Sequence, residues 1–299
     1  MATHVFAAIL THHGTAANNR GETDGNTTTL QKLVWHGSIH TTVSAESIRF
    51  ALRRRLAEFG ETLNRTFDPV SRQNAWTDPA FAGWTSDKGT RYADDDLLGF
   101  MSAEAAKEET GGKGTTRVRR AVLEVARAVS LEPWAGDVTF NAASPGATPS
   151  AAKKGSGNPV PYATEMHATR YQYGVALTPD DLHVRARAAI ALRGLCCLGE
   201  VAGNHGRFLY DFSPEVVVFR ITQDPAPRLL YCFDQRPGGV GASALVSKVV
   251  AGDIPGNELI VGGRGLLPAD EQASLSASGA ALHDGVLAAL AAVTARLPA

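Results

Sequence analysis

The chain has 299 residues, of which 44% are hydrophobic and 20% are charged, and its formal net charge is −1. This length suits one large domain with insertions, or two small ones, and can bury a sizeable core without disulfide bonds. The charge balance excludes a bulk polycation, so any nucleic acid would have to bind to local basic stripes on the surface.

The sequence has three cysteines, Cys196, Cys197 and Cys232, whose spacing fits no metal site. We expect them to be buried thiols in a reducing compartment. Residues 1–10 lack the basic start and long apolar core of a signal peptide. No window reaches the roughly eighteen apolar residues that a membrane span needs. We therefore expect a soluble, cytoplasmic protein with no membrane partner.

The first regular elements are a strand and a helix. The apolar run at residues 5–10 predicts a buried strand, and the polar, Gly- and Asn-rich stretch at 12–29 predicts a loop. A helix is expected to begin near Ser44 and to end at Gly60. Residues at spacings of four, four and three would form its apolar face: Ile48, Leu52, Leu56 and Phe59.

Two irregular stretches follow. Between about 60 and 115, aromatic residues are scattered among turn residues without a steady period, which indicates an inserted lobe. Residues 141–161 are rich in Pro, Gly, Ala and Ser, with Lys153 and Lys154 at their centre, and such a long loop is usually functional or disordered.

Regular structure resumes with an alternating strand at residues 171–177. Thr178, followed by Pro179 and two aspartates, predicts the start of a helix that runs to about Val201. Strands are expected at 216–221 and 229–233. Residues 268–297 predict a single Ala-rich helix. This order favours an α+β sheet with helices on one face, for which a ferredoxin-like or RNA-recognition-like fold is a natural candidate.

No catalytic set is evident, and we expect no cofactor. The sequence at 112–116 is not a phosphate-binding loop, because a glycine separates its lysine from the first threonine. Residues 238–241 lack the rest of a dinucleotide-binding pattern. The run Asp94, Asp95, Asp96 offers oxygen ligands for Mg²⁺, but consecutive residues rarely converge on one ion. Capping of a following helix is the simpler interpretation of this run.

Basic residues are more informative. Arg49 and Arg53 lie four apart and should project from one side of the first helix, where Arg54 and Arg55 widen the patch. Phosphate contacts need such spaced cations, although a solvated face would have the same pattern. A second basic cluster comprises Lys113, Arg117, Arg119 and Arg120. The glycine-flanked loop at 203–207 would either let a ligand approach the backbone or form a simple turn.

Four stretches together carry a family resemblance: residues 28–53 (TTLQKLVWHGSIHTTVSAESIRFALR), 92–101 (YADDDLLGFM), 162–173 (YATEMHATRYQY) and 203–220 (GNHGRFLYDFSPEVVVFR). In their order and spacing the chain resembles the DevR-type branch of the Cas-seven family, the backbone subunits of type I CRISPR Cascade complexes.

The resemblance implies one palm domain over residues 1–299, with a fingers insertion at about 60–115 and a thumb loop at about 141–165. It implies a non-catalytic subunit that polymerises along a guide crRNA, while base pairing of the guide reads the target DNA strand. Its partners would be the crRNA, neighbouring copies of itself, and the cap and large subunits of Cascade.

The resemblance also implies which residues contact the RNA. Those carried over by matching position, together with two lysines placed on the thumb by loop character, are Ser44, Ser47, Arg49, Arg53, Lys153, Lys154, His167, Arg170, Asn204, His205 and Arg207. Related subunits of other CRISPR types cut bound RNA with a loop aspartate. The alternative is therefore a metal-dependent ribonuclease that uses the run Asp94–Asp96.

Overall fold

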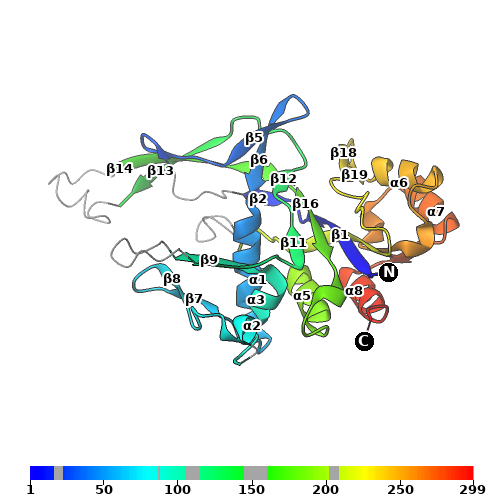
Figure 1. Cartoon of the computed structure of the whole chain (residues 1–299). Helices are drawn as coiled ribbons and strands as arrows, with labels where there is room; N and C mark the ends of the chain where they lie inside the picture. Colours follow the sequence, from blue (N-terminus) through cyan, green and yellow to red (C-terminus); the bar gives the residue numbers. More distant parts are fainter. Residues whose placement is uncertain (17–22, 87, 105–114, 145–159, 202–208, 299) are drawn as a thin grey trace, which may run out of the picture.

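The computed structural model of the chain describes residues 1–16, 23–86, 88–104, 115–144, 160–201 and 209–298 (Figure 1). In this described part the largest sheet has nine strands, in the order β21-β20-β17-β1-β16-β12-β6-β5, with β11 also paired to β16. Their bounds are β21 Ala281–His283, β20 Leu259–Gly262, β17 Pro214–Thr222, β1 His4–Thr11, β16 Tyr171–Leu177, β12 Ala128–Ser130, β6 Ser38–Val43, β5 Lys32–Trp35 and β11 Leu123–Val125.

The middle of this sheet has an α+β connectivity, as expected. The chain passes from β1 through helix α1 (Ala45–Glu58) to β11 and β12, then to β16, and through helix α5 (Arg187–Cys196) to β17. Strand β1 lies between β16 and β17 and is antiparallel to both, and β11 and β12 are antiparallel to β16. This order is consistent with a ferredoxin-like βαββαβ unit.

Helices cover both faces of the sheet, and the expectation of one covered face was wrong. Along β1, Val5 and Ile9 enter a core shared with α1, α5 and α8 (Val286–Thr294), whereas Phe6 and Leu10 enter a second core. The second core includes side chains of α6 (Ser243–Val250) and α7 (Ala269–Ala277). A continuous apolar run, without alternation, is typical of a strand that is buried on both sides.

The first helix forms as predicted. Ser44 caps α1, because its Oγ accepts a hydrogen bond from the Ser47 backbone N–H at 3.3 Å. Ile48, Leu52 and Leu56 are all buried on the side that faces the sheet. The helix ends just before Gly60, whose φ of 89° is favourable for glycine.

The second predicted helix begins later than expected. Residues Pro179–Asp181 form only a 3₁₀ turn (η2), and α5 starts at Arg187. Thr178 does not cap this turn, since its hydroxyl hydrogen-bonds to Nδ1 of His4 at 2.9 Å. The backbone N–H groups of His183 and Val184 donate to the Asp96 side chain, which fixes the intervening residues outside a helix.

Two further predictions near the C-terminus were wrong. Residues 229–233 form a turn instead of a strand, since Arg228 and Tyr231 have φ angles of 56° and 52°. Leu229, Cys232 and Phe233 lie in the second core, whereas Leu230 is exposed. The expected helix at 268–297 is divided into α7, β21 and α8, with Gly279 at φ 94° after the first of them.

Several short elements lie outside the large sheet. Between α1 and β11 the described chain forms hairpin β7–β8 (Arg65–Asp68, Gln73–Trp76), helices α2 (Ala82–Thr85) and α3 (Ala93–Leu98), and hairpin β9–β10 (Phe100–Glu104, Thr115–Arg119). A four-stranded sheet joins β13 (Val138–Ala143), β14 (Val160–Glu165), β4 (Thr27–Thr28) and β3 (Thr23–Asp24). In Figure 1 strands β7, β8, β9, β13 and β14 extend to the left of the large sheet, and α2 and α3 are drawn below it. Strand β15 (His167–Thr169) pairs with β2 (Gly14–Ala16), and β18 (Asp234–Arg236) pairs with β19 (Gly239–Gly241).

Candidate nucleic-acid interface

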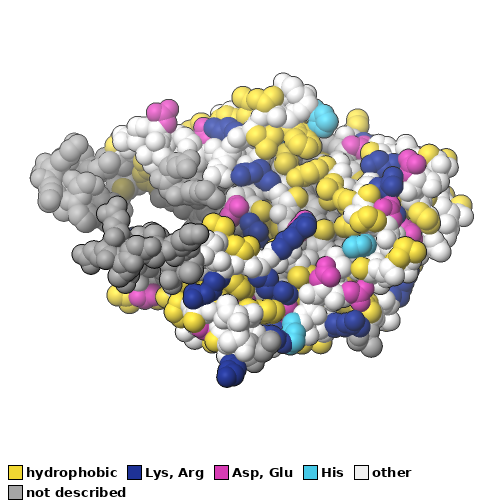
Figure 2. Space-filling model, in the orientation of Figure 1, with side chains coloured by type: hydrophobic (Ala, Val, Ile, Leu, Met, Phe, Trp, Pro, Cys, Tyr) yellow, Lys and Arg dark blue, Asp and Glu magenta, His cyan; other side chains and the backbone are white. Residues whose placement is uncertain are grey.

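A groove of about 1360 Å³ runs between α1 and the hairpins β7–β8 and β9–β10, which belong to the segment between α1 and β11, called here the inserted segment. One wall is the outer side of α1, and the other is built from β7–β8, the end of α3 and β9–β10. In the space-filling view, Lys and Arg side chains are interspersed with hydrophobic ones over the region where Figure 1 draws α1 and β9 (Figure 2).

The lining of the groove has more cationic than anionic side chains. It includes five arginines and two glutamates: Arg49, Arg53, Arg54, Arg65, Arg119, Glu46 and Glu200. Four of these arginines form ion pairs: Arg49 with Glu46, Arg53 with Asp94, Arg54 with Glu200 and Arg119 with Asp96. A local basic groove on a nearly neutral chain is the arrangement that nucleic-acid binding would require here.

Three of the predicted site residues line this groove: Ser47, Arg49 and Arg53. Arg49 forms an ion pair with Glu46 at 3.2 Å on the outer side of the helix. The Arg53 side chain is only 17% exposed, and its Nε lies 3.5 Å from Oδ2 of Asp94. Burial lowers the pKa of the Arg53 guanidinium from its usual value, with Asp94 opposing this shift. Ser44 is buried, and its role is to cap the helix.

The groove also exposes apolar side chains. Phe50 of α1 and Phe67 of β7 meet edge to face with ring centroids 6.1 Å apart, although they are 40% and 47% exposed. Met101 is 71% exposed, and the Arg65 guanidinium lies over the Trp76 ring at 5.5 Å. Aromatic faces beside cations can bind stacked bases as well as phosphates.

Sequence reasoning did not assign these groove-lining residues from the inserted segment. The signal was the unpatterned aromatics between 60 and 115, which contribute Phe67 and Trp76. Their place opposite α1 could not be known before the tertiary structure. Of the second basic cluster, Arg119 lines the groove, and Lys113 lies outside the described residues.

The other predicted site residues that the structure describes, Ser44, His167 and Arg170, do not line the groove. His167 is 4% exposed on β15, and its Nδ1 hydrogen-bonds to Oγ1 of Thr41 at 2.8 Å. Burial lowers the pKa of His167 to about 4, which keeps the ring neutral. Arg170 donates from Nε to Oε2 of Glu215 at 2.8 Å. The remaining predicted residues lie outside the described part of the chain: Lys153, Lys154, Asn204, His205 and Arg207.

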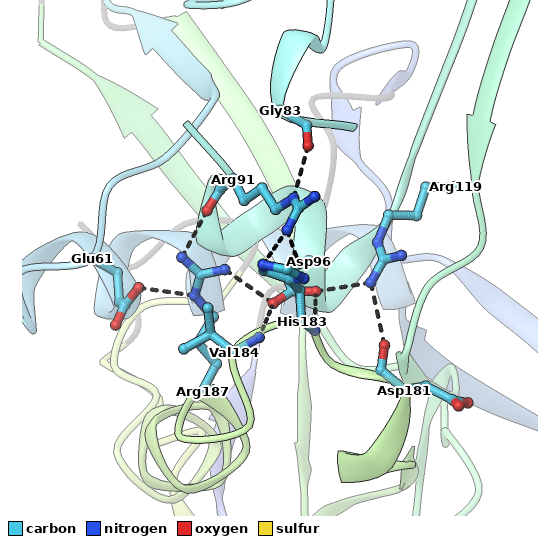
Figure 3. Close-up of polar contacts among 9 residues, drawn as sticks. All are labelled: Glu61, Gly83, Arg91, Asp96, Arg119, Asp181, His183, Val184 and Arg187. Atoms are coloured by element: carbon cyan, nitrogen blue, oxygen red, sulfur yellow. Dashed lines mark hydrogen bonds and ion pairs between the residues drawn. The ribbon is translucent and has the colours of Figure 1, made fainter. Parts of the chain in front are cut away.

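The simpler interpretation, that the run Asp94–Asp96 caps a following helix, was wrong. The run forms the first turn of α3 itself, and all three residues are at most 1% exposed. Figure 3 shows Asp96 at the centre of a polar network. Oδ1 accepts from Arg119 at 2.8 Å and from the His183 N–H at 3.0 Å; Oδ2 accepts from Arg187 at 3.0 Å and from the Val184 N–H at 3.1 Å.

The other two aspartates bind the start of the β7–β8 hairpin. The Asp94 carboxylate accepts from the backbone N–H groups of Asn64 and Arg65, at 2.8 and 2.9 Å. Asp95 accepts from Nδ2 of Asn64 at 2.9 Å, and burial raises its pKa to about 6. These oxygens face different protein donors and do not converge on one point. In the described residues, no group of three His, Cys, Asp or Glu side chains is placed to hold a metal ion.

A family model described as "CRISPR-associated negative auto-regulator DevR/Csa2" matches residues 8–187. A curated relative from Myxococcus xanthus (strain DK1622), "CRISPR-associated protein Cas7/Cst2/DevR", is 67% identical over 302 residues, which are 99% of this chain and 98% of the relative. The chain belongs to the Cas7/Cst2/DevR family. The resemblance to the DevR-type branch is thereby confirmed.

Solved structures similar to this Cas7/Cst2/DevR family member come from surveillance complexes. A chain of a "CRISPR RNA-guided surveillance complex, pre-nicking" matches with a TM-score of 0.61 and 14% identity, over 98% of this chain and 99% of that chain. A chain of a "CRISPR RNA-guided surveillance complex" matches with a TM-score of 0.55 and 18% identity, over 98% of both chains. At these identities the likeness shows a shared α+β fold. No described helix has the length and apolar character to cross a membrane.

Proposed function

We propose that this protein is a non-catalytic backbone subunit that polymerises along a guide crRNA in a type I CRISPR surveillance complex (Cascade). The observation that carries the proposal is the mixed cationic and aromatic groove along α1, in a chain of the Cas7/Cst2/DevR family. The shared fold with chains of RNA-guided surveillance complexes supports it.

In this proposal the groove binds the crRNA backbone. Arg49 and Arg53 would neutralise phosphates from α1, and Arg65 and Arg119 would do so from the opposite wall. Phosphate contacts carry no sequence information, which suits a subunit that must accept any guide. Bases left free by these contacts could then pair with the target DNA strand, which the protein itself would not read.

The described segment between α1 and β11 would act as the fingers, since none of its described strands joins the large sheet and it forms the second groove wall. The thumb is proposed for about residues 141–165, which include the end of β13 and all of its paired strand β14. Neighbouring copies would stack along the guide, and the cap and large subunits of Cascade would bind at the ends and side of that filament. We place this assembly in the cytoplasm, where a guide and its DNA target meet.

The deciding experiment co-expresses the tagged chain with its neighbouring genes and a CRISPR array, and follows the absorbance ratio at 260 and 280 nm across a size-exclusion peak. A large particle that contains a discrete RNA of guide length is expected. A matched culture without the array controls for non-specific RNA. A small, RNA-free peak with the array present would overturn the proposal.

A further inference from the structure

The buried aspartates of α3 lie beside the groove, where Asp94 and Asp96 contact arginines of its two walls. A short helix that buries three consecutive carboxylates is costly unless each finds cations or hydrogen-bond donors. Here the donors come from segments far apart in the sequence, and two of the cations line the groove. The three aspartates therefore connect separate parts of the chain beside the groove.

Asp94 joins the two walls. From α3 it faces Arg53 of α1 at 3.5 Å, and it also accepts both backbone N–H groups at the start of β7, from Asn64 and Arg65. One carboxylate thus forms an ion pair with the Arg53 guanidinium on one wall and accepts hydrogen bonds where the Arg65 side chain leaves the other. Loss of its charge would free Arg53 and loosen the base of the hairpin.

Asp96 does the same for Arg119 on the β9–β10 wall. The guanidinium donates to Oδ1 of Asp96 and lies over the Trp84 ring at 4.1 Å, so it is held from two directions. Arg187 of α5 also donates to Asp96, which ties this wall to the main body of the protein (Figure 3). A long side chain fixed in this way loses little conformational entropy when it meets a ligand.

We propose that Asp94 and Asp96 are positioning residues of the groove, which hold Arg53 and Arg119 in place to receive phosphates. The inference rests on the proposed function, and it assigns a role to an aspartate run that this function does not otherwise use. The carboxylates reduce the net positive charge near the groove, but they preorganise its cations and set the spacing of its walls.

Double-mutant cycles test this role, with binding of the full chain to a labelled guide-length RNA measured over a series of salt concentrations. Asp96→Asn keeps the size of the side chain but removes its charge. We expect it to weaken binding about tenfold, the range of one hydrogen bond to a charged group. The slope of log binding constant against log salt concentration should become less negative by about 0.7, which corresponds to one phosphate contact on a single strand. In an Arg119→Ala background, Asp96→Asn should have little further effect on binding.

The Asp94→Asn and Arg53→Ala pair is tested in the same way. Asp234→Asn is the matched control, because it also breaks an aspartate–arginine contact, Asp234 with Arg236, in strand β18 on the opposite side of the molecule (Figure 1). It should change thermal stability without changing the salt dependence. A structural role alone would lower the melting temperature and leave the salt dependence unchanged.

The outcomes separate the two proposals. If Asp96→Asn weakens binding equally with and without Arg119, or leaves binding unchanged in a folded protein, the positioning role is overturned. If Arg53→Ala and Arg119→Ala themselves bind RNA as the wild type does, the groove is not the RNA site, and the proposed function fails at this surface instead.

Discussion

Nε of Arg53 on α1 lies 3.5 Å from Oδ2 of Asp94 on α3, in a place where both side chains are largely buried. The same carboxylate accepts the backbone N–H of Arg65, so the first helix and the inserted hairpin share one anchor. The groove between them is therefore part of the folded structure, and cationic side chains lie on both of its walls.

Replacement of Arg49 and Arg53 by alanine should weaken guide-RNA binding and flatten its salt dependence. Two lost phosphate contacts on a single strand correspond to a slope change of about 1.4. Arg264→Ala is the matched control, since this arginine pairs with Asp284 on the surface and does not line the groove. Binding titrations at several salt concentrations give the slope. Unchanged affinity and slope in a folded variant would remove both residues from the site.

Phe67→Ala should weaken binding without changing the salt dependence. Phe67 is half-exposed in the groove, and loss of one base–aromatic contact costs about 1–3 kcal/mol. No charge is lost, so the slope should match that of the wild type. Leu287→Ala, an exposed apolar residue on α8, controls for a general effect of surface truncation. If the salt dependence of binding also flattened, Phe67 would act by supporting the neighbouring cations and not by stacking on a base.

The assembled complex should not cut a labelled target RNA in the presence of Mg²⁺. All three carboxylates of the run Asp94–Asp96 are buried, and most of their oxygens accept from protein donors. Denaturing gels over a time course check this. Fragments at regular spacing that disappear in Asp96→Ala would favour the ribonuclease alternative.

His167 should make folding stability fall as the solution becomes acidic. Its pKa is about 4 in the folded chain, against about 6.5 for an exposed histidine, because burial disfavours the charged ring. The folded state thus binds fewer protons, and stability is fully present above pH 6.5 and lost as the pH falls toward 4. The change is up to about 3 kcal/mol. In His167→Gln, urea unfolding at a series of pH values should lack this part of the pH dependence.

Asp95 should act with the opposite sign. Burial raises its folded pKa to about 6, above the value near 4 of an exposed aspartate, so the folded state binds more protons between these values. Its contribution to stability therefore falls as the pH rises from about 4 to 6, and the cost persists above that range. Asp95→Asn keeps an acceptor for Asn64. Its stability relative to the wild type should increase over this window; a constant difference would contradict the assigned pKa.

Local signals predicted much of the central fold. Helix α1 followed from its expected start near Ser44, its apolar spacing and its terminal glycine, which are signals within a few residues. Strands β1 and β17 followed from apolar runs of strand length, and β16 followed from the alternation at residues 171–177. The turn at 229–233 was missed because an apolar run indicates burial of side chains. It does not indicate whether the backbone pairs with another strand.

The sequence by itself determined the helix that presents Arg49 and Arg53, because helix caps and periodicity are local properties. Only the tertiary structure decided that the inserted segment lies against this helix and that Asp94 and Asp96 hold its arginines in place. Those contacts join residues that are far apart along the chain, and side chains from separate elements meet only when packing of the whole core fixes their positions.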